Sequence, residues 1–286
     1  MIAESTNHIV NILMISSIYV LVALGFALIF GVMRIMNFAH GAIYMIGGYV
    51  CYYLWVMLGL SPWASLPLTM LIMALVGLFI EKWCFRPFQR DFEKAIIMSI
   101  AIIIILRTGA DLVVGSSGKG LPPLLSGVLE IGSVTLRLDR LLVLGICLVL
   151  FVALTFFVQR SKIGLSMLAI AQDRDAAALQ GININRISAY ACAMGSGLAG
   201  LAGGLVGSVL VLHVSMADMI LVKIIAIVIL AGIGNVGGIW LGGLIVGGMD
   251  ALFPYYMSSS LAESLALGLI ILILLIRPQG FFGSEV

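Results

Sequence analysis

Long apolar runs are the feature that most constrains this chain. Several reach about 18 residues or more, the length that an α-helix needs to cross roughly 30 Å of hydrocarbon. Apolar residues make up 62% of the 286 residues and charged residues only 10%, which excludes a soluble globular domain. The runs lack the alternation of a transmembrane β-barrel. The sequence therefore predicts an all-α, polytopic membrane protein whose backbone polar groups are satisfied within helices.

Nine apolar runs are interpreted as membrane spans, all within a single transmembrane domain that covers residues 1–286. The first is taken as a retained span, because no basic segment or small-residue cleavage site precedes it. A tight GIGNVGG turn separates the seventh and eighth runs, so these two could be broken or re-entrant pieces, and the prediction is eight or nine spans. Residues 115–140, rich in Gly, Ser and Pro, are expected to form an irregular loop. The runs are 9–31, 38–60, 63–85, 95–114, 141–158, 187–212, 219–232, 239–254 and 262–276.

Basic residues favour one orientation of these spans. If residues 160–186 are cytoplasmic, ten of the 15 Lys and Arg residues lie on the cytoplasmic side and three on the other. Such an excess is typical of cytoplasmic loops. With nine spans, the amino terminus is predicted outside and the carboxyl terminus inside.

The longest polar interruption, residues 160–186, is expected to have a role beyond joining two spans. Its middle, residues 172–181, is predicted to form a short helix with Asp173 as the N-cap, Asp175 in the first turn and Gly181 at the end. The small side chains of Ala176 and Ala177 suit insertion into a groove on a partner protein. Two interpretations stay open: docking of a motor subunit, or an amphipathic linker on the membrane surface.

Charges within the spans are the next candidates, because a charge in the bilayer costs a few kcal/mol or more. Arg107 and Asp111 are four residues apart and are expected to pair near the outer end of their helix. Lys223 could line a solvated path or reach outward toward Asp218. Asp250 is expected at the membrane interface. No mid-membrane chain of Asp, Glu and His predicts a proton relay.

Two segments resemble each other weakly. MNFAHGAIYMIGGYV (36–50) and GIGNVGGIWLGGLIVGG (232–248) each place an asparagine, Asn37 or Asn235, in a polar bend before a helix of small residues. Transporters built from two inverted halves show this kind of symmetry near their substrate path. His40 follows the first bend, where it could equally serve polar packing at a helix end. Candidate path residues are Asn37, His40, Lys223 and Asn235. Glycines at four-residue spacing, such as Gly200 with Gly204 and Gly203 with Gly207, predict close helix packing.

Motifs for chemistry are missing from the sequence. GSSGKG (115–120) lacks the leading Gly and the final Ser or Thr of a phosphate-binding loop. The four cysteines are scattered singly, without metal-ligand spacing, and are expected to pack in apolar surroundings. No catalytic constellation appears, so the chain is not expected to be an enzyme, to hold a metal or cofactor, or to bind nucleic acid.

The chain as a whole resembles a known family. The NFAHG element, the segment GLSMLAIAQDRDAAALQGININR, the run KIIAIVILAGIGNVGGIWLGG and the tail LLIRPQGFFG are similar, in this order, to the LIV-type permeases of branched-chain amino acid ABC importers. The likeness runs from about residue 9 to residue 283. It is greatest to the shorter of the two permeases that such importers pair.

The resemblance implies a transport subunit without its own nucleotide site. It implies a second permease subunit, two cytoplasmic ATPase subunits that use the ATP, a periplasmic or extracellular substrate-binding protein, and the cytoplasmic (inner) membrane of a prokaryote. Branched-chain or other hydrophobic amino acids are the expected substrates; alternatives are urea or short amides, or a stand-alone channel or secondary carrier. By resemblance, the coupling helix seated on an ATPase comprises Asp173, Arg174, Asp175, Ala176, Ala177, Leu179 and Gly181.

Overall fold

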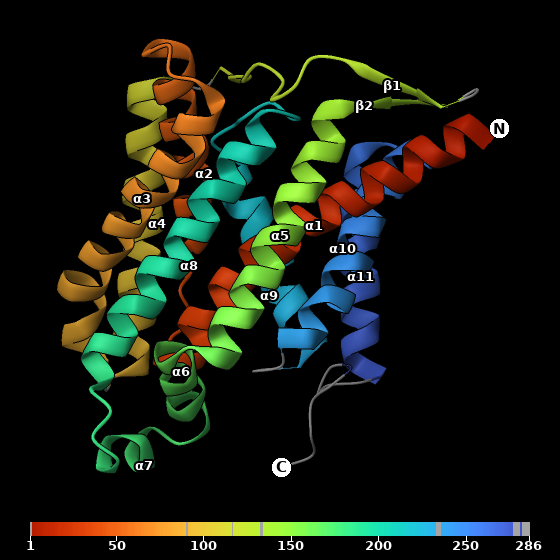
Figure 1. Cartoon of the computed structure of the whole chain (residues 1–286). Helices are drawn as coiled ribbons and strands as arrows, with labels where there is room; N and C mark the ends of the chain where they lie inside the picture. Colours follow the sequence, from red (N-terminus) through yellow and green to blue (C-terminus); the bar gives the residue numbers. More distant parts are fainter. Residues whose placement is uncertain are drawn as a thin grey trace. The chain divides into compact units, whose positions relative to one another are not determined.

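The computed structural model describes residues 2–89, 91–115, 117–131, 134–232, 236–276 and 281. Helices dominate this part of the chain (Figure 1). The α-helices are α1 (Ile2–Met33), α2 (His40–Tyr52), α3 (Pro62–Ile80), α4 (Phe92–Val114), α5 (Leu138–Arg160), α6 (Lys162–Gln172), α7 (Arg174–Leu179), α8 (Ile184–Gly207), α9 (Met216–Ala231), α10 (Val236–Tyr256) and α11 (Ser259–Ile276). Short π-helices, η1 (Tyr53–Met57) and η2 (Glu81–Phe85), extend α2 and α3, and a 3₁₀ turn, η3 (Arg86–Phe88), follows η2.

Every predicted span overlaps a helix, but the sixth, 187–212, was predicted too long: α8 ends at Gly207, and Leu212 forms an isolated β-bridge with Lys119. Within the described residues, six helical stretches are long and apolar enough to cross a membrane: Thr6–Met33, Pro62–Phe88, Phe92–Val114, Leu138–Arg160, Ile184–Gly207 and Gly237–Tyr256. The polytopic α-helical fold is thus confirmed. The number of eight or nine spans stays a prediction, because α2 and α9 have only 13 and 16 residues.

The chain divides into two compact units, which are described separately. We call Leu24–Pro122 with Val152–Leu221 the α8 unit, and Met1–Ala23 with Pro123–Phe151 and Val222–Val286 the α10 unit. In the α8 unit, α2 and α3 both pack along α8 (Figure 1). Residues 195–207 of α8 are buried without interruption. This helix therefore forms the core of its unit.

Glycines let these helices touch through their backbones. A Cβ atom at Gly203 of α8 would lie 2.0 Å from the carbonyl oxygen of Tyr44 in α2, and one at Gly47 would lie 2.2 Å from the Cα of Gly200. Real Cβ atoms essentially never approach other atoms so closely. The predicted close packing at these glycines is confirmed.

The α10 unit contains the first part of α1, most of α5 and α9, and α10 packed on α11. Between α4 and α5, β1 (Val128–Ile131) and β2 (Val134–Arg137) form an antiparallel pair with Val128 opposite Arg137. The prediction that residues 115–140 are wholly irregular was therefore wrong. Both strands, VLEI and VTLR, carry the β-branched residues that favour strands, and this local signal was outweighed by the surrounding Gly, Ser and Pro.

Candidate functional site

The polar segment 160–186 folds as two short helices, α6 and α7, rather than the single helix that the sequence predicted. Ser161 caps α6, its hydroxyl accepting a hydrogen bond from the Gly164 amide at 2.9 Å. Asp173 ends α6 and begins α7: its carboxylate accepts hydrogen bonds from the amides of Asp175 and Ala176, both at 3.0 Å. The predicted N-cap of α7 is confirmed.

Gly181 ends α7 in the predicted way. Its φ of +82° lies in the left-handed region, which glycine adopts without strain. Its amide donates to the Ala178 carbonyl at 3.0 Å, and the following Ile182 amide donates to the Ala177 carbonyl at 3.1 Å. This pair of hydrogen bonds satisfies carbonyls that a helix end leaves open. The helix is therefore defined by its own sequence at both ends.

The two faces of α7 differ in exposure. Ala177 is buried within its own chain, with 4% of its surface exposed, whereas Leu179 is 88% exposed. Asp175 and Ala176 are also exposed. The alanine face was predicted as one inserting surface, yet Ala177 points inward and helps to seat the helix. The solvent-exposed face of α7 consists of Leu179 and its exposed neighbours.

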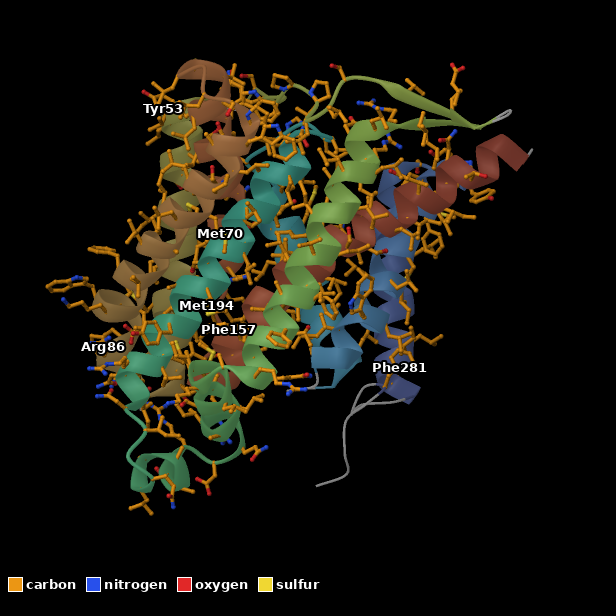
Figure 2. All side chains as sticks on the ribbon, in the orientation of Figure 1. Tyr53, Met70, Arg86, Phe157, Met194 and Phe281 are labelled. Atoms are coloured by element: carbon orange, nitrogen blue, oxygen red, sulfur yellow. The ribbon has the colours of Figure 1, made fainter. Side chains whose placement is uncertain are left out.

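A groove of about 820 Å³ lies beside α7. One side is formed by the turn after α3, with Arg86 and Gln89, and the other by Arg174 and Asp175 of α7 together with residues 182–185. Arg86 is labelled in Figure 2, and Figure 1 shows α7 lying beyond the ends of α3 and α8 within the same unit. The groove is thus lined largely by polar and charged side chains.

A buried carboxylate anchors this groove. Glu81, at the start of η2, has no exposed side-chain surface. Arg86 donates a hydrogen bond to each of its carboxylate oxygens, from Nε to Oε1 at 3.1 Å and from Nη2 to Oε2 at 2.6 Å. Gln89 Nε2 also donates to Oε1 at 3.3 Å, and Gln89 Oε1 accepts from Arg174 Nη2 at 2.8 Å. A chain of hydrogen bonds therefore connects the end of α3 to α7.

Sequence reasoning missed Glu81. Its signal was a lone carboxylate at the end of an apolar run, with Arg86 five residues later.

Arg34 holds the end of α6: its Nη2 donates to the carbonyls of Ala171 and Gln172, at 3.3 and 3.4 Å. A cation is favoured at a helix C-terminus.

Two predicted path residues, Asn37 and His40, lie together at the start of α2. Asn37 is 1% exposed and its Oδ1 accepts from the Ala39 amide at 3.1 Å, while its Nδ2 has no hydrogen-bond partner among the described residues. His40 is completely buried, and its ring meets Phe26 edge-on at 5.7 Å. Asn235 lies outside the described residues. Their role in a path stays a prediction.

Lys223 and Asp250 face each other in the α10 unit. Lys223 Nζ of α9 lies 2.6 Å from Asp250 Oδ2 of α10, with 18% and 19% of the two side chains exposed. Tyr19 of α1 donates to the same Oδ2, and Lys223 Nζ lies 3.2 Å from its hydroxyl and 5.4 Å from its ring centre. The alternative in which Lys223 reaches toward Asp218 was wrong, because Lys223 pairs with Asp250 instead. The interfacial position of Asp250 stays a prediction.

Asp218 instead forms an ion pair with Arg107 of α4, in the α8 unit. Sequence spacing had paired Arg107 with Asp111 on the same helix. The structure places the better partner on another helix, which no local pattern could reveal.

The chain is similar to known proteins over most of its length. A family model described as the permease component of branched-chain amino acid transport systems matches residues 8–276. The high-affinity branched-chain amino acid transport system permease protein BraD of Pseudomonas aeruginosa is 31% identical over 97% of this chain and 95% of its own length. The LivH permease of the corresponding system in Escherichia coli is 31% identical over 94% and 92%. A probable branched-chain amino acid transport permease protein of Methanocaldococcus jannaschii is 28% identical over 94% and 90%. No solved structure matches the chain.

Proposed function

This chain belongs to the family of permease components of branched-chain amino acid transport systems, and from that premise we propose that it is a membrane subunit of an ATP-driven importer. With a second permease subunit it would form the path for branched-chain or other hydrophobic amino acids across the cytoplasmic membrane of a prokaryote. Two ATPase subunits would supply the energy, and a binding protein on the outer side would deliver the substrate. The relatives' names support this choice of substrate.

The observation that carries the proposal is the construction of α7. A six-residue helix has little stability alone, yet this one is capped at both ends and tied to the buried Glu81 through Gln89 and Arg174. It nevertheless leaves Leu179 88% exposed. A rigidly held helix with an unburied leucine beside a polar groove suits the docking of a partner protein. A linker lying on the membrane surface has no need of the anchor.

Leu179 determines how much affinity for the ATPase subunits a substitution in α7 should remove. Burying a leucine side chain in a partner contributes about 1.5–3 kcal/mol. Leu179→Ala should therefore weaken the association with the ATPase subunits by roughly ten- to a hundredfold, and Leu179→Glu should weaken it further. Leu125, an exposed leucine in the loop between α4 and β1, provides the matched control.

The test is co-purification from membranes in mild detergent. The wild-type chain and Leu125→Glu should bring down two ATPases and a second permease, whereas Leu179→Glu should lose the ATPases and keep the second permease. A wild-type chain that purifies alone would favour the channel or carrier alternative. If the Leu179→Glu variant retained the ATPases, α7 would not be part of the docking surface. Uptake of urea, but not leucine, by the purified complex would favour urea or short amides as the substrate class.

A further inference from the structure

Three helices of the α10 unit bring opposite charges together inside apolar segments. Lys223 comes from α9, Asp250 from α10 and Tyr19 from α1, and their polar atoms meet within hydrogen-bond distance. Ionisable residues within membrane helices are costly and usually mark a functional site or a substrate pathway. This pair therefore calls for an explanation beyond helix packing.

Both members of the pair keep unused hydrogen-bonding capacity. Tyr19 and Lys223 both contact Oδ2 of Asp250, and Oδ1 accepts no hydrogen bond from the described residues. A lysine ammonium has three protons, and two of them serve Asp250 and Tyr19. Within the described part of the chain, one acceptor and one donor are thus left on adjacent, opposite charges. Neither side chain is sealed, since 18% and 19% of their surfaces are exposed.

The helices that carry the pair are held at a fixed spacing. A Cβ atom at Gly243 of α10 would lie 2.3 Å from Val20 Cγ2 of α1, and one at Gly242 would lie 2.7 Å from the Ile227 carbonyl oxygen of α9. These contacts lie about two turns from Asp250 on α10, at the residue after Tyr19 on α1 and about one turn from Lys223 on α9. A binding site on elements in such close contact is pre-organised.

We propose that Lys223 and Asp250, supported by Tyr19, form a binding site for the zwitterionic head of an α-amino acid. The substrate carboxylate would accept a hydrogen bond from Lys223 Nζ, and the substrate ammonium would donate to Asp250 Oδ1. In the absence of substrate the two side chains neutralise each other. This arrangement spares the importer two isolated charges in an apolar region. The inference rests on the proposed function, because it names a recognition site for that function's substrate class.

The alternative is an ion pair that only holds three helices together, and a double substitution separates the two. Replacing a buried ion pair by apolar residues of similar volume is often neutral for stability. Lys223→Met with Asp250→Leu should therefore preserve a purely structural role while abolishing recognition of a zwitterion. Arg107→Met with Asp218→Leu removes the Arg107–Asp218 ion pair, which lies in the α8 unit, and is the matched control.

The experiment uses the complete importer, purified with its partner subunits and reconstituted in lipid vesicles with its binding protein. Uptake of radiolabelled leucine is compared with ATP hydrolysis and subunit composition. The double variant at 223 and 250 should assemble and hydrolyse ATP like wild type, but take up leucine roughly tenfold more slowly or worse, the factor that about 1.4 kcal/mol produces. The control double variant should transport normally.

Wild-type leucine uptake by the 223/250 double variant would overturn the inference and leave the proposed function intact. A wild-type complex without ATPases, or without leucine uptake, would overturn the proposed function first. Tyr19→Phe is the milder second variant if the charged positions do not assemble. It should raise the leucine concentration needed for half-maximal uptake with assembly unchanged, and an unchanged concentration dependence would count against the site.

Discussion

The ion pair between Glu81 and Arg86 makes an asymmetric prediction about stability. The Glu81 side chain is fully buried, whereas 36% of the Arg86 side chain is exposed. Removing one partner of a buried pair costs about 3–5 kcal/mol because the other charge stays buried and uncompensated. Among the described residues, Arg86→Met leaves the carboxylate with Gln89 as its remaining side-chain partner, at 3.3 Å. Because water can approach from the open side of Arg86, we place the loss of unfolding free energy near the lower end, about 3 kcal/mol.

The opposite substitution should be much milder. Glu81→Gln removes the buried charge, and the exposed Arg86 can then turn toward water. The loss should be close to that of one ordinary hydrogen bond, about 1 kcal/mol. The double variant Glu81→Met with Arg86→Met should return toward wild-type stability, because no charge then remains buried. If exposure alone set the loss of unfolding free energy, Arg86→Met would be milder than Glu81→Gln, because exposed residues usually tolerate substitution.

The unfolding free energy of each variant can be measured by denaturant titration of the purified chain in detergent micelles. The reasoning is refuted if Arg86→Met destabilises the chain no more than Glu81→Gln does. Hydrogen exchange gives a second readout. In the double variant Gln89 loses its acceptor at position 81, so the α7 amides, held through Arg174, should exchange faster than in wild type, whereas Arg86→Met keeps this hydrogen bond.

Three further predictions concern packing and local structure. Gly203→Ala forces a methyl group against the Tyr44 carbonyl and should cost about 1–3 kcal/mol of unfolding free energy. The control, Gly109→Ala in α4, where a Cβ meets nothing within 4 Å, should be neutral or stabilising by up to about 1 kcal/mol. Equal changes in unfolding free energy for the two variants would refute the contact. Asp173→Ala removes the cap of α7 and should cost about 1 kcal/mol of local stability, seen as faster amide exchange at Asp175 and Ala176 while α8 is unchanged. A maleimide should label Cys84, which is partly exposed, before the buried Cys51, Cys147 and Cys192, and early labelling of Cys192 would contradict its burial.

Signals local in the sequence predicted their structures well. The apolar runs marked every helix that they were expected to mark, and Asp173 and Gly181 delimited α7, because capping depends on residues only a few positions apart. The partners of charged residues could not be predicted in this way. Lys223 and Asp250 lie 27 positions apart and Arg107 and Asp218 lie 111 apart, so their pairing depends on how helices pack.

The candidate site was predictable to the same limited extent. The segment 160–186 stood out by its polarity, but which side of α7 faces outward depends on what α6 and the turn after α3 cover. Ala177 was therefore grouped with the exposed residues, and Glu81 was overlooked. The predicted internal repeat stays a prediction, since Asn235 lies outside the described residues.

The backbone contacts of α8 have a mechanical consequence. Helices whose carbonyls and Cα atoms already touch, as at Gly203 and Gly47, have no layer of side chains between them to deform. A helix of 24 residues is about 36 Å long, and α7 joins its beginning through only four residues, 180–183. Any tilt imposed on α7 by a partner would be carried along that whole length, with α2 and α3 moving together with α8. The glycine contacts therefore make the α8 unit stiff, so that a displacement of α7 would move the long helices together as one body.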